Sequence, residues 1–262
     1  MTTTIALAGK GGVGKTTIAG MIIKYLLQRQ PGAVLAIDAD PSSNLNMVLG
    51  LDLEWTVGDI REGLLGQVKE SLTMGGAAMG TLSGGITKQE YLDYEIRSAL
   101  AEGDQIDLIA MGKPEGQGCY CAVNHNLREV IDAISRNYRF VVIDNEAGME
   151  HLSRRTTRDV QHLLVISDPS QRGIVAAERI ADFRHELDIS IEQTGLIVNR
   201  INGEIPPVLQ ERIDQMDIPL LGVVPADNEL LEFEFSGQPL VELGDDSPVY
   251  QAVARIVDQI LS

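Results

Sequence analysis

The sequence predicts an α/β fold, a doubly wound and mostly parallel sheet flanked by helices. Short, wholly apolar runs, such as those at 33–37 and 140–143, are typical of parallel strands that are covered on both faces. Segments with the apolar spacing of amphipathic helices alternate with these runs along the chain. The 262 residues are compatible with a single domain over 1–262.

The first predicted strand leads into the clearest motif of the chain. After the apolar run at 4–8, positions 9–16 read GKGGVGKT, which matches the Gly-x4-Gly-Lys-Thr pattern of a phosphate-binding P-loop. The helical spacing that follows predicts a helix N-terminus whose free N–H groups and positive dipole end face the anion. Lys15 would contact the β- and γ-phosphates, and Thr16 would offer its hydroxyl to Mg²⁺. The motif therefore predicts ATP or ADP with Mg²⁺ as cofactors, bound by Gly11, Gly12, Val13, Gly14, Lys15, Thr16 and Thr17.

The second predicted strand, at 33–37, ends in acidic residues. Positions 38–41 read DADP, which places Asp38 and Asp40 directly after the strand. Carboxylates at the carboxyl edge of a doubly wound sheet lie where the ligand binds, so a nucleotide-site role is favoured. The alternative is a pair of turn-forming aspartates before a proline.

Residues 43–104 are expected to form a mainly helical and loop connection. A short helix through 45–49 could be capped by Ser42 or Ser43, and helical spacing recurs over 55–68 and 88–100. The stretch 73–86 is rich in glycine, methionine and serine and is expected to be a mobile loop. This connection carries no recognisable chemistry, and it could be a docking surface for a partner or a lid.

Two cysteines follow the strand predicted at 106–111. Cys119 and Cys121 lie in a glycine-rich loop just before a helix predicted at 124–136, and a helix N-terminus favours the metal-binding thiolate. A closed tetrahedral thiolate site needs four ligands, which two copies on a two-fold axis would supply. The spacing therefore suggests a metal held between protomers, with His125 as a further ligand or an ordinary helix residue. The alternatives are two small apolar residues packed under a loop, or a strained redox disulfide.

The second half of the chain continues the alternation of strands and helices. Strands are predicted at 138–144, ending in Asp144, and at 160–167, 194–200 and 219–224, with helices at 171–187 and 206–216. The last helix, 248–261, is amphipathic and has no basic face, unlike a helix that targets membranes.

Composition narrows the classes of function. The net charge of −17 argues against a nucleic-acid or anionic-membrane partner. No apolar run approaches the ~18–20 residues of a membrane span, and no secretory signal is evident. Two cysteines this close together would not form a disulfide that stabilises the fold. We therefore expect a cytoplasmic protein in which the thiols have a metal or redox role.

Taken together, the motifs resemble one family. Lys10 makes the P-loop GKGGVGKTT, and the chain also carries DADP at 38–41, GCYC at 118–121 and DNEAGMEH at 144–151. This set closely resembles the accessory ATPases of carbon monoxide dehydrogenase and acetyl-CoA synthase over nearly the whole chain. These belong with MinD, ParA, the arsenite-pump ATPase and the nitrogenase iron protein, which have a deviant Walker A motif.

The resemblance implies roles for several charged residues. Lys10 would reach across a nucleotide-dependent homodimer to the partner's ATP, so that Lys10, Lys15 and Asp40 are the expected catalytic residues. Asp40 would align the attacking water, Asp38 would lie in the Mg²⁺ shell, and Asp144 would contact Mg²⁺ through water. Glu146 stands where the family commonly has proline, which adds a carboxylate near the nucleotide.

The resemblance also implies residues that contact the nucleotide base and residues that bind a cargo metal. Asn199 would contact the adenine edge, and the loop with Pro225 and Asp227 would close over the base. The paired Cys119 and Cys121 would hold Ni²⁺ or Zn²⁺. The implied function is an ATPase that assists nickel insertion into carbon monoxide dehydrogenase or a related enzyme. Two alternatives are a MinD- or ParA-like positioning ATPase and an iron–sulfur carrier or scaffold.

Overall fold

The computed structural model describes residues 2–63, 87–112, 121–147, 159–186 and 189–262. It does not describe the side chains at 88, 121–126 and 128. The expected loop at 73–86 and Cys119 therefore lie outside the described residues.

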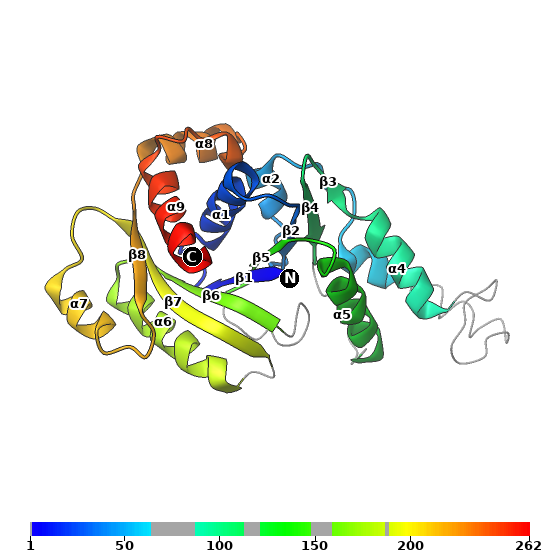
Figure 1. Ribbon diagram of the computed structural model, residues 1–262, viewed down its shortest axis with the longest axis horizontal. Helices are drawn as coiled ribbons and strands as arrows, with labels where there is room; N and C mark the ends of the chain where they lie inside the picture. Colours follow the sequence, from blue (N-terminus) through cyan, green and yellow to red (C-terminus); the bar gives the residue numbers. More distant parts are fainter. Residues whose placement is uncertain (1, 64–86, 113–120, 148–158, 187–188) are drawn as a thin grey trace.

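Eight strands of the described chain form one sheet in the order β3-β4-β2-β5-β1-β6-β7-β8 (Figure 1). Every neighbouring pair is parallel except β3 with β4. The prediction of a doubly wound, mostly parallel sheet is confirmed. The strands are β1 (Thr3–Gly9), β2 (Val34–Asp38), β3 (Ala101–Glu102), β4 (Ile106–Ala110), β5 (Phe140–Asp144), β6 (Asp159–Ser167), β7 (Ser190–Ile201) and β8 (Leu220–Pro225).

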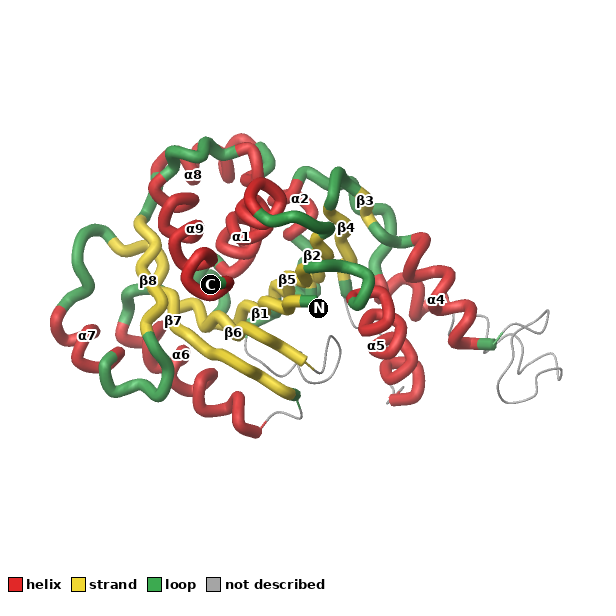
Figure 2. The backbone as a smooth tube through the Cα atoms, viewed as in Figure 1, coloured by secondary structure: helices red, strands yellow, loops and turns green. Residues whose placement is uncertain are grey.

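Helices cover both faces of the sheet (Figure 2). One face packs against α1 (Lys15–Arg29), α2 (Leu45–Leu49), α8 (Asn228–Ser236) and α9 (Pro248–Leu261). The other face packs against α4 (Lys88–Ser98), α5 (Cys121–Ser135), α6 (Gln171–Phe183) and α7 (Pro207–Ile213). Because helices lie on both sides, the central strands are buried on both faces, which explains their continuous apolar sequences.

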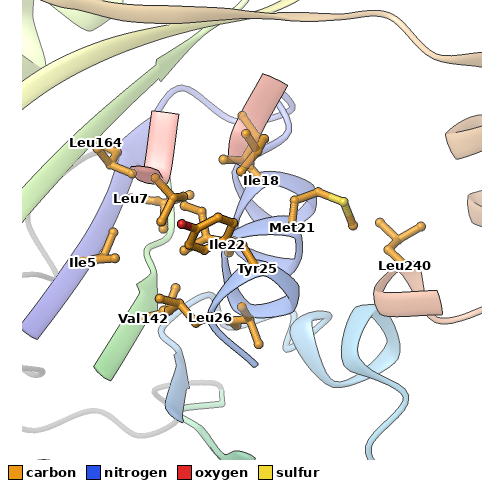
Figure 3. Packing of buried hydrophobic residues seen from close by; sticks show 14 of the residues in the cluster. Ile5, Leu7, Ile18, Met21, Ile22, Tyr25, Leu26, Val142, Leu164 and Leu240 are labelled. Atoms are coloured by element: carbon orange, nitrogen blue, oxygen red, sulfur yellow. The ribbon is translucent and has the colours of Figure 1, made fainter. Parts of the chain in front are cut away.

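Helix α1, which directly follows the P-loop, packs tightly against the sheet. Its buried side chains, among them Ile18, Ile22 and Leu26, pack toward Leu7 of β1 and Val142 of β5 (Figure 3). Both Ile18 and Ile22 are fully buried. This packing holds the start of the helix in a fixed position relative to the sheet edge where the P-loop lies.

Some predicted details differ from the structure. The predicted cap of α2 by Ser42 or Ser43 was wrong, because the helix begins after Asn44, which makes no side-chain cap bond. The Leu45 N–H instead donates to Asp38 Oδ2 at 2.9 Å. Strand β3 and helix α8 were not predicted, and β7 starts at Ser190, earlier than its apolar core.

Candidate nucleotide site

Three strands bring the predicted site residues to one edge of the sheet. Strand β5 lies between β1 and β2, and Asp144 is in register with both Leu7 and Asp38. Because parallel strands end on the same side, the P-loop after β1 lies beside both carboxylates. The structure thus places Asp38, Asp144 and the P-loop together, as the sequence predicted.

The P-loop requires glycine at its two ends. At Gly9 a Cβ atom would lie 2.4 Å from the Ile166 carbonyl oxygen of β6. At Gly14, the N-cap of α1, φ is +91°, and a Cβ would lie 2.4 Å from Asn199 Nδ2. A side chain at either position would force the loop away from the sheet edge.

Lys15 is folded into the P-loop and is 7% exposed. Its Nζ donates to the carbonyl oxygens of Gly9 at 3.3 Å and Lys10 at 3.4 Å. Burial lowers the pKa of Lys15, and the nearby charges of Asp144, Asp40 and Glu146 partly offset this effect. The geometry places a buried cation inside a loop that can receive phosphates.

Asp144 and Thr16 form the candidate Mg²⁺ site. The Thr16 hydroxyl donates to Asp144 Oδ2 at 2.5 Å. The carboxylate is 1% exposed, and its Oδ1 has no hydrogen-bond partner among the described residues. Burial, together with the charges of Asp38 and Asp40, raises the pKa of Asp144 to about 7, against the opposing effects of Thr16 and Lys15. A threonine hydroxyl and an unpaired carboxylate oxygen are hard oxygen donors that suit Mg²⁺.

Asp38 differs from Asp144 because both of its oxygens already accept backbone hydrogen bonds. Oδ1 accepts from Asp40 N–H at 3.0 Å, and Oδ2 accepts from Leu45 N–H. Burial raises the pKa of Asp38 to about 6, although these bonds oppose the shift. In this structure Asp38 organises the turn that leads to α2, and its place in the Mg²⁺ shell stays a prediction.

Asp40 is more accessible than Asp38. It is partly exposed, and its Oδ1 accepts from Ser42 N–H at 2.8 Å. Its charge influences the pKa values of both Lys15 and Asp144, so the carboxylate lies near the phosphate-binding loop. This position is compatible with its predicted role toward the attacking water.

Sequence analysis assigned no role to Asn145, although this residue directly follows Asp144, the acid at the end of β5. It is 1% exposed, and its Nδ2 donates to the Leu7 carbonyl oxygen at 2.8 Å. Its Oδ1 has no hydrogen-bond partner among the described residues. Asn145 therefore ties the start of the segment after β5 to β1. The following Glu146 is partly buried and its charge acts on Lys15, while residues 148–151 of this motif lie outside the described ranges.

The residues predicted to surround the base make bonds within the protein. Asn199 is 6% exposed and its Nδ2 donates to the Val13 carbonyl oxygen at 2.8 Å. Asp227 caps α8 by accepting from Glu229 N–H and also accepts from the Ser247 hydroxyl at 2.8 Å. Pro225 ends β8. Their contacts to a base stay predictions.

The outer side of the P-loop has two further features. The Thr17 hydroxyl donates to Glu234 Oε1 of α8 at 3.2 Å, a contact that the sequence did not reveal. The exposed Lys10, with Gly11, lines a hollow of about 610 Å³ against Ala147 and α6.

The two cysteines of the predicted cargo site fall outside or at the limit of the described residues. Cys119 lies outside the described residues, and Cys121 is the first residue of α5, without a described side chain. Within the described ranges, no group of three or more His, Cys, Asp or Glu residues is arranged to hold a metal ion.

Comparison with known proteins agrees with this geometry. Residues 4–240 match the model of the CobQ/CobB/MinD/ParA nucleotide binding domain. An ATP-binding protein of Methanocaldococcus jannaschii, described as uncharacterized, is 40% identical over 258 residues, which cover 98% of each chain. Carbon monoxide dehydrogenase accessory protein CooC of Rhodospirillum rubrum is 29% identical over 243 residues, 91% of this chain and 89% of CooC.

A solved structure shows the same fold. The septum site-determining protein MinD of Pyrococcus horikoshii, complexed with Mg-ADP, has a TM-score of 0.68 and 22% identity, and the match covers 99% of this chain and 96% of MinD.

The fold and the P-loop define a nucleotide-binding protein of the P-loop class. The chain belongs to the CobQ/CobB/MinD/ParA nucleotide binding domain family. No helix in the described ranges combines the length and the hydropathy that a bilayer span requires.

Proposed function

We propose that this protein is an ATP-hydrolysing metallochaperone that assists nickel insertion into carbon monoxide dehydrogenase or a related nickel enzyme. The observation that carries the ATPase part is the site in which the P-loop holds the buried Lys15 and the Thr16 hydroxyl donates to the buried Asp144. The 29% identity to CooC, and the cysteine pair in the sequence, support the metallochaperone part.

The proposed hydrolytic step uses four residues. Lys15 would bind the β- and γ-phosphates, and Thr16 with Asp144 would hold Mg²⁺, which would neutralise phosphate charge. Asp40 would align the attacking water, and its partly exposed carboxylate, whose charge acts on Lys15, supports this role. The geometry limits direct solvent contact at Lys15 and Asp144, which strengthens their electrostatic effect on the phosphates.

We further propose a homodimer in the ATP-bound form. The exposed position of Lys10 supports this, since the residue lines the hollow beside α6. In the dimer Lys10 would reach the partner's ATP, as the deviant P-loop implies. The net charge of −17 opposes association, so this cation would have to offset charge repulsion at the interface.

The cargo site is proposed at Cys119 and Cys121 of two protomers. The segment that carries them leaves the sheet after β4, where Ala110 is in register with Asp38. Met111 N–H also donates to the Asp38 carbonyl oxygen at 2.8 Å. The start of the cysteine loop is thus bonded to the same turn that leads to Asp40, a direct route by which nucleotide state could change metal affinity.

The test is metal stoichiometry measured against oligomeric state. Size exclusion with light scattering would be run without nucleotide, with ADP and with a slowly hydrolysed ATP analogue, after Ni²⁺ or Zn²⁺ is added. We expect about one metal per dimer. Cys119→Ser should lose the metal and keep basal hydrolysis, whereas Lys15→Ala should lose nucleotide-dependent dimerisation.

Other outcomes would redirect the assignment. A nucleotide-dependent dimer without metal would support a positioning ATPase switch. Iron with a visible absorption band would support an iron–sulfur carrier or scaffold. Equal metal content in Cys119→Ser and the wild type would rule out the thiolate site.

A further inference from the structure

The end of β7 departs from regular strand geometry beside the P-loop. Its register with β8 shifts between Asn199, which pairs with Val224, and Ile201, which pairs with Pro225. Arg200, between them, has φ +61°, a left-handed backbone conformation that non-glycine residues rarely adopt. These features together indicate a β-bulge with Arg200 as the extra residue.

The packing of neighbouring residues shows the same insertion. Leu196 and Val198 pack on the α6 face of the sheet, whereas Ile197 packs on the α1 face. Strict alternation would place Ile201 on the α1 face, but it packs on the α6 face. One extra residue has therefore shifted the alternation by one position.

The bulge directs two consecutive side chains at one loop. Asn199 Nδ2 donates to the Val13 carbonyl oxygen at 2.8 Å, and Arg200 Nη1 donates to the Gly12 carbonyl oxygen at 2.9 Å. The Arg200 N–H also donates to Asn199 Oδ1 at 2.9 Å, which fixes the orientation of the amide. In a regular strand, consecutive side chains point to opposite faces and could not make both contacts.

These two contacts orient N–H groups of the P-loop. In a trans peptide unit, the C=O and the following N–H point in opposite directions. Holding the Gly12 carbonyl therefore turns the Val13 N–H to the other side of the loop, and holding the Val13 carbonyl does the same for the Gly14 N–H. Backbone N–H groups of a P-loop are the ones that bind phosphates.

We propose that Asn199 and Arg200 form a clamp that presets the P-loop for phosphate binding, and that Arg200 is a positioning residue for the nucleotide. The inference rests on the nucleotide binding of the proposed function and is independent of the metal site. A strained backbone conformation is retained at Arg200 because it brings the guanidinium to the Gly12 carbonyl.

Arg200→Gly separates this role from a merely structural one. Glycine adopts a positive φ without strain, so the variant should unfold at the same temperature as the wild type or higher. It also loses the guanidinium, so it should bind nucleotide about tenfold more weakly, as expected for one hydrogen bond involving a charged group. A structural role alone would move stability and affinity in the same direction.

The experiment is calorimetric titration of the full chain with ADP and Mg²⁺, with inorganic tripolyphosphate as a base-free competitor. Arg200→Gly should weaken both ligands about equally, and Arg200→Lys should recover part of the affinity. The matched control is Gln105→Gly, which relieves another positive φ (+60°) at the far end of the sheet and should leave affinity unchanged.

Three results would count against the clamp. Unchanged affinity in Arg200→Gly would overturn it, as would weaker ADP binding with unchanged tripolyphosphate binding, which would indicate a contact to the base or ribose. A wild type that bound neither ligand would overturn both the clamp and the proposed ATPase. Loss of metal with normal nucleotide binding would affect the proposed chaperone function alone.

Discussion

Asp144→Asn is expected to stabilise the nucleotide-free protein at alkaline pH while removing its Mg²⁺ site. The carboxyl group titrates near 3.8 in the unfolded chain and at about 7 in the folded protein, chiefly because it is buried. Its folded state therefore binds the proton more tightly, and stability falls as the pH rises from about 4 to 7. Above pH 7 the buried charge costs on the order of 4 kcal/mol.

Asparagine removes this charge at nearly constant shape. Its side-chain oxygen can still accept from the Thr16 hydroxyl, but its amide group replaces the carboxylate oxygen that has no described partner. An unpaired buried amide costs about 1–3 kcal/mol, which leaves a net gain of about 2 kcal/mol at pH 8. At pH 4 the wild-type carboxyl is protonated and carries no buried charge, so the gain should be lost and the variant should be less stable by the amide cost of about 1–3 kcal/mol.

The assay is urea unfolding, followed by circular dichroism, in EDTA without nucleotide at pH 4, 6 and 8. The comparison removes the contributions of titrating groups that are distant from Asp144, and Lys15 is the coupled group, because the Asp144 charge acts on its pKa. Asp52→Asn, at an exposed position, controls for loss of one negative charge. With ATP and Mg²⁺ at about 100 times the dissociation constant, the wild type alone should gain about 2.7 kcal/mol. A variant that is less stable at pH 8, or a gain that is independent of pH, would refute the reasoning.

Four further substitutions test other parts of the structure. Lys15→Ala should abolish detectable nucleotide binding because it removes the buried cation of the P-loop, whereas Lys10→Ala should retain binding by titration calorimetry. His162→Gln should become more stable than the wild type as pH falls below 6.5, since burial lowers the pKa of His162 and the folded state resists its protonation. Ile22→Ala should lower the free energy of unfolding by about 2–5 kcal/mol in urea titrations, because Ile22 is fully buried.

Each of these has an outcome that would contradict it. Unchanged ATP affinity in Lys15→Ala would refute the P-loop assignment. A pH profile of unfolding that is identical in His162→Gln and the wild type would show that His162 is accessible to protons in the folded state. An Ile22→Ala loss below about 1 kcal/mol would mean that α1 is less tightly packed than its burial indicates.

Much of the site could be predicted from the sequence because its signals are local. The P-loop is a contiguous string between an apolar strand and a helix, so its pattern is visible without the fold. Asp38 and Asp144 each follow an apolar run directly, and strands in a parallel sheet end at one edge. The helix predicted at 248–261 corresponds to α9.

Only the tertiary structure shows the features that depend on contacts between distant segments of the chain. Pairing of strands far apart in the sequence sets the order of the sheet, and burial sets the high pKa of Asp144. Asp227, an acid that follows a strand, accepts from the Ser247 hydroxyl, a bond to a residue 20 positions away that no local pattern encodes. Likewise, the bulge at Arg200 brings it to Gly12, which lies 188 residues away in the chain. The sequence alone determined the chemistry of the P-loop, whereas long-range packing determined which side chains hold that loop in shape.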